Sequence, residues 1–338
     1  MLTGKTRNLG VMGWPIAHSL SPVLQNAAIV KAGLDYVYTA LPVRPEQLSE
    51  AVNGLKALQF RGWNVTIPHK AAIIPLLDEI DEDARMIGAV NTVVNDDGKL
   101  IGYNTDMTGF IQALLDQGFN PAGREVVLLG AGGAARAVVW GLIKAGARGI
   151  HIGVRSPEKV QPLVDEFHSY GALDVSHWES KTFQQWLQTT DLLVNTTPLG
   201  MTPHLDGMAP VDWSKVNPSA FAYDIIYTPA ETRFLREARL CGHVTLNGEA
   251  MLAGQGAAAF QLWTGVRPDL SHRHARDVAQ LLAGRDRREP AHRRENHRRA
   301  ACNSQSCFIA PSWGERNSGG KLNTFESPGQ TIVAPKKA

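Results

Sequence analysis

The stretch VVLLGAGGAARAVVWGL, residues 126–142, decides the fold of this chain. Four apolar residues lead into a run of glycine and alanine, and apolar residues at helical spacing follow. The pattern predicts a buried strand, a tight turn with the spacing G-x-G-x-x-A, and a helix. Such a turn brings the backbone close to a pyrophosphate, and the free N–H groups at the helix start favour an anion. We therefore predict a dinucleotide site in a Rossmann-like sheet, formed by Gly130, Ala131, Gly132, Gly133 and Ala134.

Residues 150–154 predict the next strand of the same unit, and the residues after it bear on the choice of cofactor. NAD-binding proteins usually place Asp or Glu there, to hold the ribose hydroxyls. Here Arg155 and Ser156 follow the strand, with Lys159 close by and no acid before Glu158. A guanidinium suits the 2′-phosphate of NADP, so the sequence favours NADP over NAD.

Length and composition fit a protein of two ordinary domains. No apolar run approaches the roughly 20 residues that a membrane span needs, and the first ten residues lack the apolar core of a signal peptide. The three cysteines, Cys241, Cys302 and Cys307, are too few for a disulfide framework and lack the spacing of a zinc site. We therefore expect a cytoplasmic protein that neither associates with a membrane nor binds a metal.

Composition changes near Arg285, where Arg-rich clusters give way to Ser, Gly, Pro and Asn without an apolar period. Such a segment cannot bury enough surface to offset its ordering entropy. We predict that residues 285–338 form a disordered basic tail. Because no aromatic platform accompanies its basic clusters, we do not expect nucleic acid as a partner.

Polar residues in the first half of the chain fall at the ends of expected elements. Ser19 and Ser21 stand at the start of a helix expected over residues 21–32, where Ser21 would be the N-cap or both hydroxyls would bind a carboxylate. Pro68 is expected to open a short helix with Lys70 in its first turn, although a helix start disfavours a cation. Asp106 could simply cap a further helix. Each residue alone has an ordinary explanation, but together they suit a polyhydroxylated ligand.

These motifs occur in an order that resembles the shikimate dehydrogenase family, the NADP-dependent enzymes of the chorismate pathway to the aromatic amino acids. The resemblance covers residues 9–283. It rests on SLSP at 19–22, NVTIPHK at 64–70, GAVNT at 88–92, NTD at 104–106, GAGGA at 130–134, NTTPLGM at 195–201, YDIIY at 223–227 and GQ at 254–255. So many ordered motifs at consistent spacing are specific where each alone is not.

The resemblance implies an α/β fold with two domains and a substrate in the cleft between them. An N-terminal α/β substrate domain would span residues 1–108 and be completed by C-terminal helices at 249–284. A Rossmann-like parallel-sheet NADP domain would span residues 109–248. Lys70 and Asp106 match the family's catalytic positions.

The remaining site residues follow from the same resemblance. Those that match substrate-binding positions are Ser19, Ser21, Thr66, Asn91, Asp106, Tyr227 and Gln255. Those assigned to the cofactor site, besides the residues above, are Glu82, Thr196, Ile225 and Gly248. One departure is that Val154 precedes Arg155 where the family usually has Asn, which removes one cofactor contact.

The implied reaction is reversible hydride transfer between NADPH and the ketone of 3-dehydroshikimate, giving shikimate. Lys70 would donate the proton, and Asp106 would hold it in place. One alternative is a quinate/shikimate dehydrogenase that uses NAD, against which Arg155 argues. Another is a non-catalytic sensor of shikimate-like ligands, against which the presence of both Lys70 and Asp106 argues. The sequence leaves open whether the chain forms a homodimer.

Overall fold

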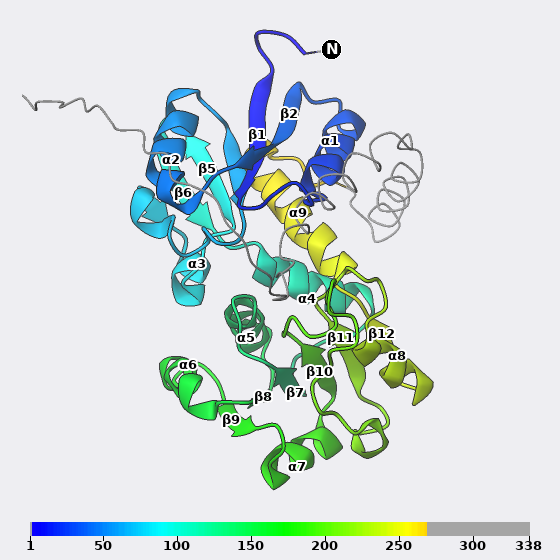
Figure 1. The fold of residues 1–338 in the computed structure, drawn as a ribbon. Helices are drawn as coiled ribbons and strands as arrows, with labels where there is room; N and C mark the ends of the chain where they lie inside the picture. Colours follow the sequence, from blue (N-terminus) through cyan, green and yellow to red (C-terminus); the bar gives the residue numbers. More distant parts are fainter. Residues whose placement is uncertain (1, 269–338) are drawn as a thin grey trace, which may run out of the picture. The chain divides into compact units, whose positions relative to one another are not determined.

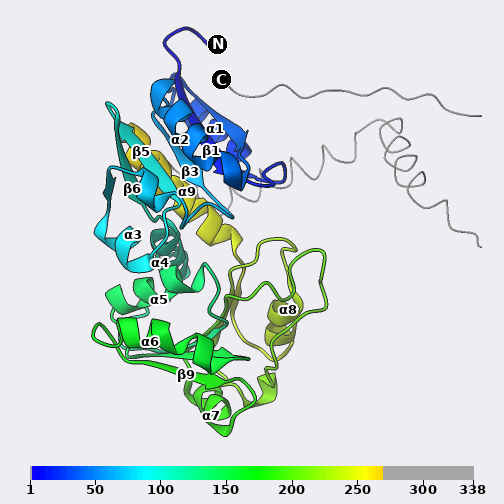
Figure 2. The same ribbon diagram turned by 60° about the vertical axis from the view of Figure 1, so that its left-hand side comes forward.

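The computed structural model describes residues 2–268 (Figure 1). The basic tail expected over residues 285–338 lies outside the described residues, as does the part of the expected C-terminal helices beyond residue 268. Within the described part, the chain forms two six-stranded sheets with helices on their faces (Figures 1 and 2).

Strands and helices follow one another in the chain order that an α/β fold requires. The strands of the first sheet are β1 (Arg7–Gly13), β2 (Tyr36–Pro42), β3 (Gly62–Val65), β4 (Glu79–Ile80), β5 (Thr92–Asp96) and β6 (Lys99–Tyr103). Those of the second are β7 (Glu125–Leu129), β8 (Gly149–Val154), β9 (Leu173–His177), β10 (Leu192–Asn195), β11 (Phe221–Asp224) and β12 (Thr245–Leu246).

Helices connect and cover these strands. The α-helices are α1 (Ser21–Lys31), α2 (Leu48–Ala57), α3 (Glu82–Ile87), α4 (Asp106–Asp116), α5 (Ala135–Lys144), α6 (Gln161–Phe167), α7 (Lys181–Thr189), α8 (Arg233–Leu240) and α9 (Glu249–Thr264). Short 3-10 helices are η1 (Pro45–Gln47), η2 (Ile74–Leu76), η3 (Pro157–Lys159) and η4 (Trp213–Lys215).

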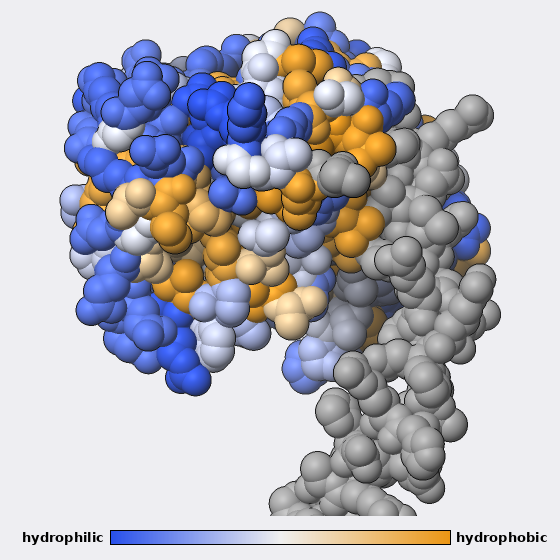
Figure 3. All heavy atoms as spheres, turned by 90° about the horizontal axis from the view of Figure 1, so that it is seen from above, coloured by the Kyte–Doolittle hydropathy of each residue, from blue (hydrophilic) through white to orange (hydrophobic). Residues whose placement is uncertain are grey.

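Between residues 2 and 268, none of these helices combines the length and the apolar character that crossing a membrane demands. On the face seen in Figure 3, hydrophobic residues are exposed next to hydrophilic ones. Such a mixture is the ordinary surface of a folded domain.

The second sheet is the parallel sheet that the glycine stretch predicts. Its strand order is β12-β11-β10-β7-β8-β9, and every neighbouring pair is parallel. This part of the chain begins at the central strand β7, adds β8 and β9 on one side, and then adds β10, β11 and β12 on the other side. The connections from β7 and from β10 thus lead to opposite sides of the sheet. In doubly wound sheets, ligands bind in the crevice between two such strands, at their carboxyl ends.

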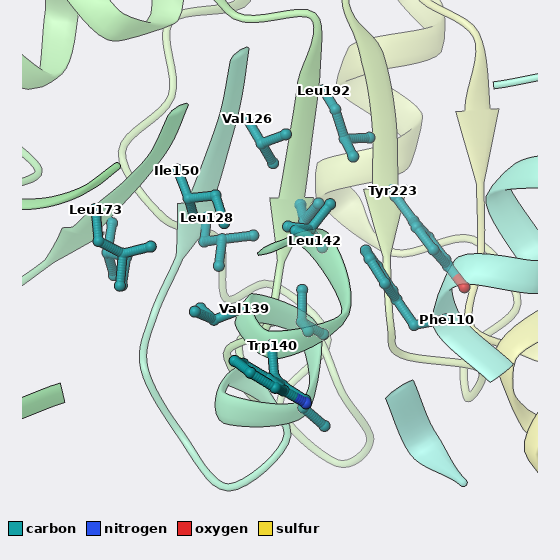
Figure 4. Packing of buried hydrophobic residues seen from close by; sticks show 14 of the residues in the cluster. Phe110, Val126, Leu128, Val139, Trp140, Leu142, Ile150, Leu173, Leu192 and Tyr223 are labelled. Atoms are coloured by element: carbon teal, nitrogen blue, oxygen red, sulfur yellow. The ribbon is translucent and has the colours of Figure 1, made fainter. Parts of the chain in front are cut away.

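Burial of β7 on both faces explains its uninterrupted apolar sequence. Val126 and Leu128 pack with α5 on one face, where Trp140 and Leu142 lie (Figure 4). The alternate residues of β7 pack on the opposite face, against α7 and α8. The strand–turn–helix prediction for residues 126–142 is thus confirmed.

The first sheet is mixed, with the order β2-β1-β3-β5-β6-β4. Its strands β5 and β6 are antiparallel and joined at Asp97 and Gly98, whose φ values are 47° and 93°. Helix α2 covers one face of the sheet, and α1 and α9 cover the other. Helix α9 reaches this face after leaving the second sheet, so the end of the described chain completes the first sheet (Figures 1 and 2).

Helices α4 and α9, which both lead from one sheet to the other, cross at a pair of glycines. A Cβ atom added to Gly109 would lie 2.6 Å from the backbone N of Gln255 and 2.6 Å from the carbonyl O of Met251. A Cβ atom on Gly254 would lie 3.0 Å from the Cα of Gly109. Since helix separation depends on the side chains at the contact, only glycine allows this approach.

The helix expected to carry Lys70 does not form. Residues 67–73 make turns, and the 3-10 helix η2 follows them. The carbonyl O of Lys70 accepts a hydrogen bond from Val90 N at 2.8 Å, which ties this backbone to a distant segment. Pro75 in addition has no N–H for a helical hydrogen bond. Lys70 therefore lies in a turn rather than at a helix N-terminus.

We expect Gly109→Ala to lower the free energy of unfolding by about 1–3 kcal/mol, because its methyl group would meet backbone atoms that cannot yield. Gly54→Ala is a matched control inside helix α2, where an added Cβ meets nothing within 4 Å. It should raise stability by up to about 1 kcal/mol. Urea denaturation measures both changes, and equal stabilisation by the two would contradict the close crossing.

Candidate active site

A cavity of about 240 Å³ receives residues from both sheets and from helix α9. The sequence-predicted residues that line it are Ser19, Ser21, Thr66, Lys70, Asn91, Asp106, Ala134, Ile225, Tyr227, Gly248 and Gln255. The structure thus brings together every residue assigned to substrate or to catalysis. It also adds Asn64, His18 and Met251, which were not assigned from the sequence. The sequence contains a feature that could have indicated Asn64: it is an amide at the end of an expected buried strand, and such a group is costly to bury unless it has hydrogen-bond partners.

Lys70 and Asp106 form an ion pair in this cavity. The Lys70 Nζ donates to Asp106 Oδ2 at 2.5 Å, and Asn91 Nδ2 donates to Asp106 Oδ1 at 2.9 Å. Both oxygens of the carboxylate are therefore held, one by a cation and one by an amide. Thr105 occupies the N-cap position of α4, so the Asp106 side chain does not serve as a cap.

Ser19 and Ser21 stand at the start of α1. The expectation that Ser21 is the N-cap is wrong by one residue: Leu20 is the N-cap, and its apolar side chain supplies no cap hydrogen bond. The helix starts early because Leu20 already has helical backbone angles. Ser19 Oγ accepts from the backbone N of Ser21 at 3.3 Å. Both serines line the cavity, at a helix start that favours an anion.

Tyr227 and Gln255 close the cavity from the side of the second sheet and α9. Burial raises the pKa of Tyr227 above its usual range, so the phenol stays protonated and can donate a hydrogen bond. The Gln255 Nε2 donates to Leu252 O at 2.9 Å within its own helix, which fixes the direction of the amide. Gln255 is half-buried against the cavity rather than on an exposed polar face.

A buried carboxylate, Asp224, holds together the loops that lead to Ile225 and Tyr227. It accepts hydrogen bonds from Asn195 Nδ2 at 3.1 Å, Ile226 N at 3.0 Å and Thr232 Oγ1 at 2.6 Å. Burial nevertheless raises the pKa of Asp224 to about 6. This group joins the end of β10, which borders the crevice, to the end of its neighbour β11.

The glycine turn fits a pyrophosphate. Gly130 has a φ of 92°, and a Cβ there would lie 2.5 Å from Thr197 Cγ2, so glycine is required. Among the described residues, the N–H groups of Gly132, Gly133 and Ala134 donate to no protein group. A Cβ at Gly132 would meet only one atom, at 3.9 Å, so the space before the turn is open.

Thr196 supports this turn instead of offering its hydroxyl to a ligand. Its Oγ1 donates to Leu129 O at 2.9 Å and lies 3.0 Å from Gly130 O. Since the residue is also buried, we infer that Thr196 shapes the cofactor site from behind.

Arg155 and its neighbours lie directly beside the glycine turn. Strands β7 and β8 are adjacent, and Gly130 N donates to Gly153 O at 2.9 Å. Arg155 and Lys159 are exposed and Ser156 is half-buried, without a side-chain cap hydrogen bond to η3. The Arg155 guanidinium carbon lies 6.0 Å from the centre of the Trp178 ring. These residues can receive an anionic group next to the turn.

Glu82 is the one assigned residue that the structure leaves apart from these groups. It is exposed at the first turn of α3 and does not line the cavity. Its helix packs against α5, where Arg136 Nε donates to Ile87 O at 2.6 Å. No cluster of His, Cys, Asp and Glu that could hold a metal ion occurs between residues 2 and 268.

A doubly wound parallel sheet with this glycine turn, beside a cavity that contains a lysine–carboxylate pair, defines a nucleotide-dependent dehydrogenase. Residues 11–93 match the profile of the shikimate dehydrogenase substrate binding domain, and residues 248–272 match that of the shikimate 5′-dehydrogenase C-terminal domain. A Geobacter metallireducens protein named shikimate dehydrogenase (NADP(+)) is 47% identical over 285 residues, which are 83% of this chain and 99% of that protein. The chain therefore belongs to the shikimate dehydrogenase family, as the motifs predict.

Solved structures agree with this assignment. The Listeria monocytogenes shikimate 5-dehydrogenase, in complex with shikimate and NAD, is 34% identical with a TM-score of 0.78, over 83% of this chain and 98% of that one. The Thermus thermophilus enzyme, in complex with NADP(H) and shikimate, is 36% identical with a TM-score of 0.72, over 80% of this chain and 99% of that one. The predicted α/β fold is confirmed.

The raised pKa of Asp224 predicts a pH dependence of stability. The native state holds this proton more tightly than the unfolded chain, so the stabilisation is complete below pH ~4 and is lost as the pH rises through about 6. Asn cannot titrate. The unfolding free energy of the wild type, relative to that of Asp224→Asn, should therefore fall by about 1–3 kcal/mol between pH ~4 and pH ~7.5.

Urea denaturation at several pH values measures this difference. Asp212→Asn is the control, because hydrogen bonds from Ser214 and Lys215 lower the pKa of Asp212 to about 2. Asp212 stays ionised in both states over most of this range, so its curve should be nearly flat. Parallel curves for the two variants would show that Asp224 is not protonated preferentially in the native state.

Proposed function

We propose that this chain catalyses the reversible NADPH-dependent reduction of 3-dehydroshikimate to shikimate, in the biosynthesis of chorismate and the aromatic amino acids. The observation that carries the proposal is the Lys70–Asp106 pair, which lies in one cavity with the paired serines of α1 and with Ala134 of the glycine turn. Two relatives that align with 83% and 78% of this chain are both named shikimate dehydrogenase (NADP(+)).

The cavity offers separate groups to the two ends of the substrate. The hydroxyls of Ser19 and Ser21, at the start of α1, would bind the carboxylate. The groups available for the ring hydroxyls and the ketone are Thr66, Asn91, Asp106, Tyr227 and Gln255. With the carboxylate held at one end and the hydroxyls at the other, the substrate ring would have one orientation in the cavity.

Lys70 would donate a proton to the oxygen of the ketone as the carbonyl carbon accepts a hydride. The reduced nicotinamide of NADPH supplies that hydride when bound. Asp106 holds the Lys70 ammonium in place through the 2.5 Å hydrogen bond. In the reverse direction, neutral Lys70 would take the proton from the hydroxyl of shikimate.

The cofactor would lie along the carboxyl ends of β7, β8 and β11. Residues 130–134 would hold the pyrophosphate, through the free N–H groups of Gly132, Gly133 and Ala134. Arg155, Ser156 and Lys159 would bind the 2′-phosphate. Ile225 and Gly248 line the cavity, where they can receive the nicotinamide.

The proposal divides the chain into a substrate domain, residues 1–108 completed by α9, and an NADP domain, residues 109–248. Its location would be the cytoplasm, with shikimate or 3-dehydroshikimate as the small-molecule partner, and a homodimer is a hypothesis for sedimentation analysis. Quinate oxidation with NAD is the rival activity. Steady-state rates with both substrates and both cofactors separate the two activities.

We expect Lys70→Met to lower kcat by about 10²–10⁴-fold, the usual contribution of general acid–base catalysis. The KM for shikimate should change much less, because Ser19 and Ser21 hold the carboxylate. Asp106→Asn should damage both parameters. The absorbance of NADPH at about 340 nm, the band of the reduced nicotinamide, follows the reaction.

Lys56→Met is the matched control, since Lys56 pairs with Asp78 at 3.3 Å outside the cavity. Its kcat should equal that of the wild type. If Lys70→Met instead raised KM and preserved kcat, Lys70 would bind substrate without donating the proton.

We expect Arg155→Ala to weaken NADPH binding by roughly 10–100-fold, because charge-assisted hydrogen bonds to the 2′-phosphate are lost. Binding of NADH should hardly change. Arg148→Ala, which breaks a 2.7 Å contact with Glu125 at the opposite end of β8, should affect neither cofactor. Fluorescence titration measures the dissociation constants of both cofactors. An equal loss of affinity for NADPH and NADH would contradict the role of Arg155.

A further inference from the structure

Behind the cavity, a series of buried hydrogen bonds leads from a tyrosine to the Asp106 carboxylate. Tyr38 Oη donates to Asn64 Oδ1 at 2.6 Å, and Asn64 Nδ2 donates to Thr92 Oγ1 at 3.1 Å. Thr92 Oγ1 donates to Asn91 Oδ1 at 2.9 Å, and Asn91 Nδ2 donates to Asp106 Oδ1 at 2.9 Å. Thr92 is fully buried and Tyr38 is 2% exposed.

The two asparagine amides of this series can point in only one direction. An ionised carboxylate only accepts, so Asn91 must present its amino group to Asp106. The Asn91 oxygen then faces Thr92, whose hydroxyl proton is used on it. Thr92 is left with a lone pair that accepts from the amino group of Asn64.

The orientation of Asn64 follows from a second contact. Asn64 Nδ2 also donates to the backbone O of Asn91 at 3.1 Å, and a carbonyl only accepts, so the amide oxygen of Asn64 faces Tyr38 Oη and accepts from it at 2.6 Å. Asn64 must then turn its amino group toward Thr92. The orientations of both asparagine amides are therefore determined by the hydrogen-bond network itself.

Thr92 is the member of the series that joins the two amides. Asn91 Oδ1 is also held by the backbone N of Thr105 at 2.8 Å, which anchors that side chain to the start of α4. The hydroxyl of Thr92 extends this anchoring to Asn64, which lines the cavity. Thr92 itself lies behind the lining residues.

We propose that Thr92 is a positioning residue for the reaction: its buried hydroxyl fixes the amides of Asn64 and Asn91 relative to each other, and through Asn91 it keeps the Asp106 carboxylate directed at Lys70. The inference rests on the proposed reduction of 3-dehydroshikimate. Thr92 acts through its neighbours, so it should influence the rate of the chemical step and not the binding of the cofactor.

The test compares variants of the whole chain in the shikimate-oxidation assay. Thr92→Val keeps the shape of the side chain but removes the hydroxyl that accepts from Asn64 and donates to Asn91. Asn64 then keeps only the backbone O of Asn91 as an acceptor for its amino group, and Asn91 Oδ1 keeps only donors from Thr105. We expect kcat to fall about 10-fold, which corresponds to about 1.4 kcal/mol, with the KM for NADP unchanged. Thr92→Ser keeps the hydroxyl and should restore most of the rate.

Thr190→Val is the matched control. Thr190 is also fully buried, and its hydroxyl donates to Leu192 O at 2.8 Å, at the opposite end of the second sheet from the cavity. Its loss should lower the melting temperature while leaving kcat and both KM values of the folded enzyme unchanged. A structural effect of losing a buried hydroxyl is thereby separated from a positioning effect.

Two results would overturn the inference: a folded Thr92→Val enzyme with wild-type kcat, or a Thr92→Ser enzyme as slow as Thr92→Val. If Thr92→Val does not fold, Tyr38→Phe decides, since it removes the first donor of the series and keeps the ring. Tyr38 also hydrogen-bonds with Ser21, so the KM for shikimate must be read as well. A lower kcat with unchanged KM values for shikimate and NADP supports the inference, and an unchanged kcat overturns it. A wild-type chain that does not oxidise shikimate overturns the proposed function as well, and this outcome is seen before any variant is measured.

Discussion

The crossing of α4 and α9 is the constraint on which the rest of the structure depends. At Gly109 and Gly254 the two backbones touch without side chains between them. Asp106 begins α4 one turn before this contact, and Gln255 follows it directly on α9. A change in helix separation would therefore move cavity residues on both helices together. The contact has no flexible side chain that could absorb such a change, which makes it a firm support.

The charged groups of the cavity are half-buried and paired with each other. Lys70 and Asp106 neutralise each other, so the proposed substrate carboxylate would meet hydroxyls and a helix start instead of a free cation. A neutral site of this kind selects its ligand by geometry more than by net charge. Hydrogen bonds behind the lining then matter as much as the groups that face the ligand, because an unpaired buried amide costs more than a hydrogen bond contributes.

Local features of the fold could be predicted from the sequence, and long-range ones could not. The strand, turn and helix over residues 126–142 depend on neighbours in sequence and were predicted correctly. The helix expected at Pro68 was wrong because the Lys70 carbonyl pairs with Val90, a contact that no local pattern reveals. Cavity residues could be named through the resemblance to a family, yet Asn64 and Thr92 were missed, since their importance comes from contacts across the sheet.

The return of α9 to the first sheet has a consequence for the order in which a nascent chain matures. Trp263 donates to Val93 O at 2.9 Å, and Gln25 Nε2 donates to Gly256 O at 3.0 Å, so α9 seals a face whose strands leave the ribosome long before it. Until then Leu9, Val11 and Val94 have only the part of their apolar cover that α1 supplies. The second sheet is synthesised later, but its strands β7 to β12 all precede α9 in the chain. All of its strands are therefore made before α9 emerges. During translation the half that is made first is therefore the half that finishes folding last, and its uncovered face is the surface that a chaperone would bind.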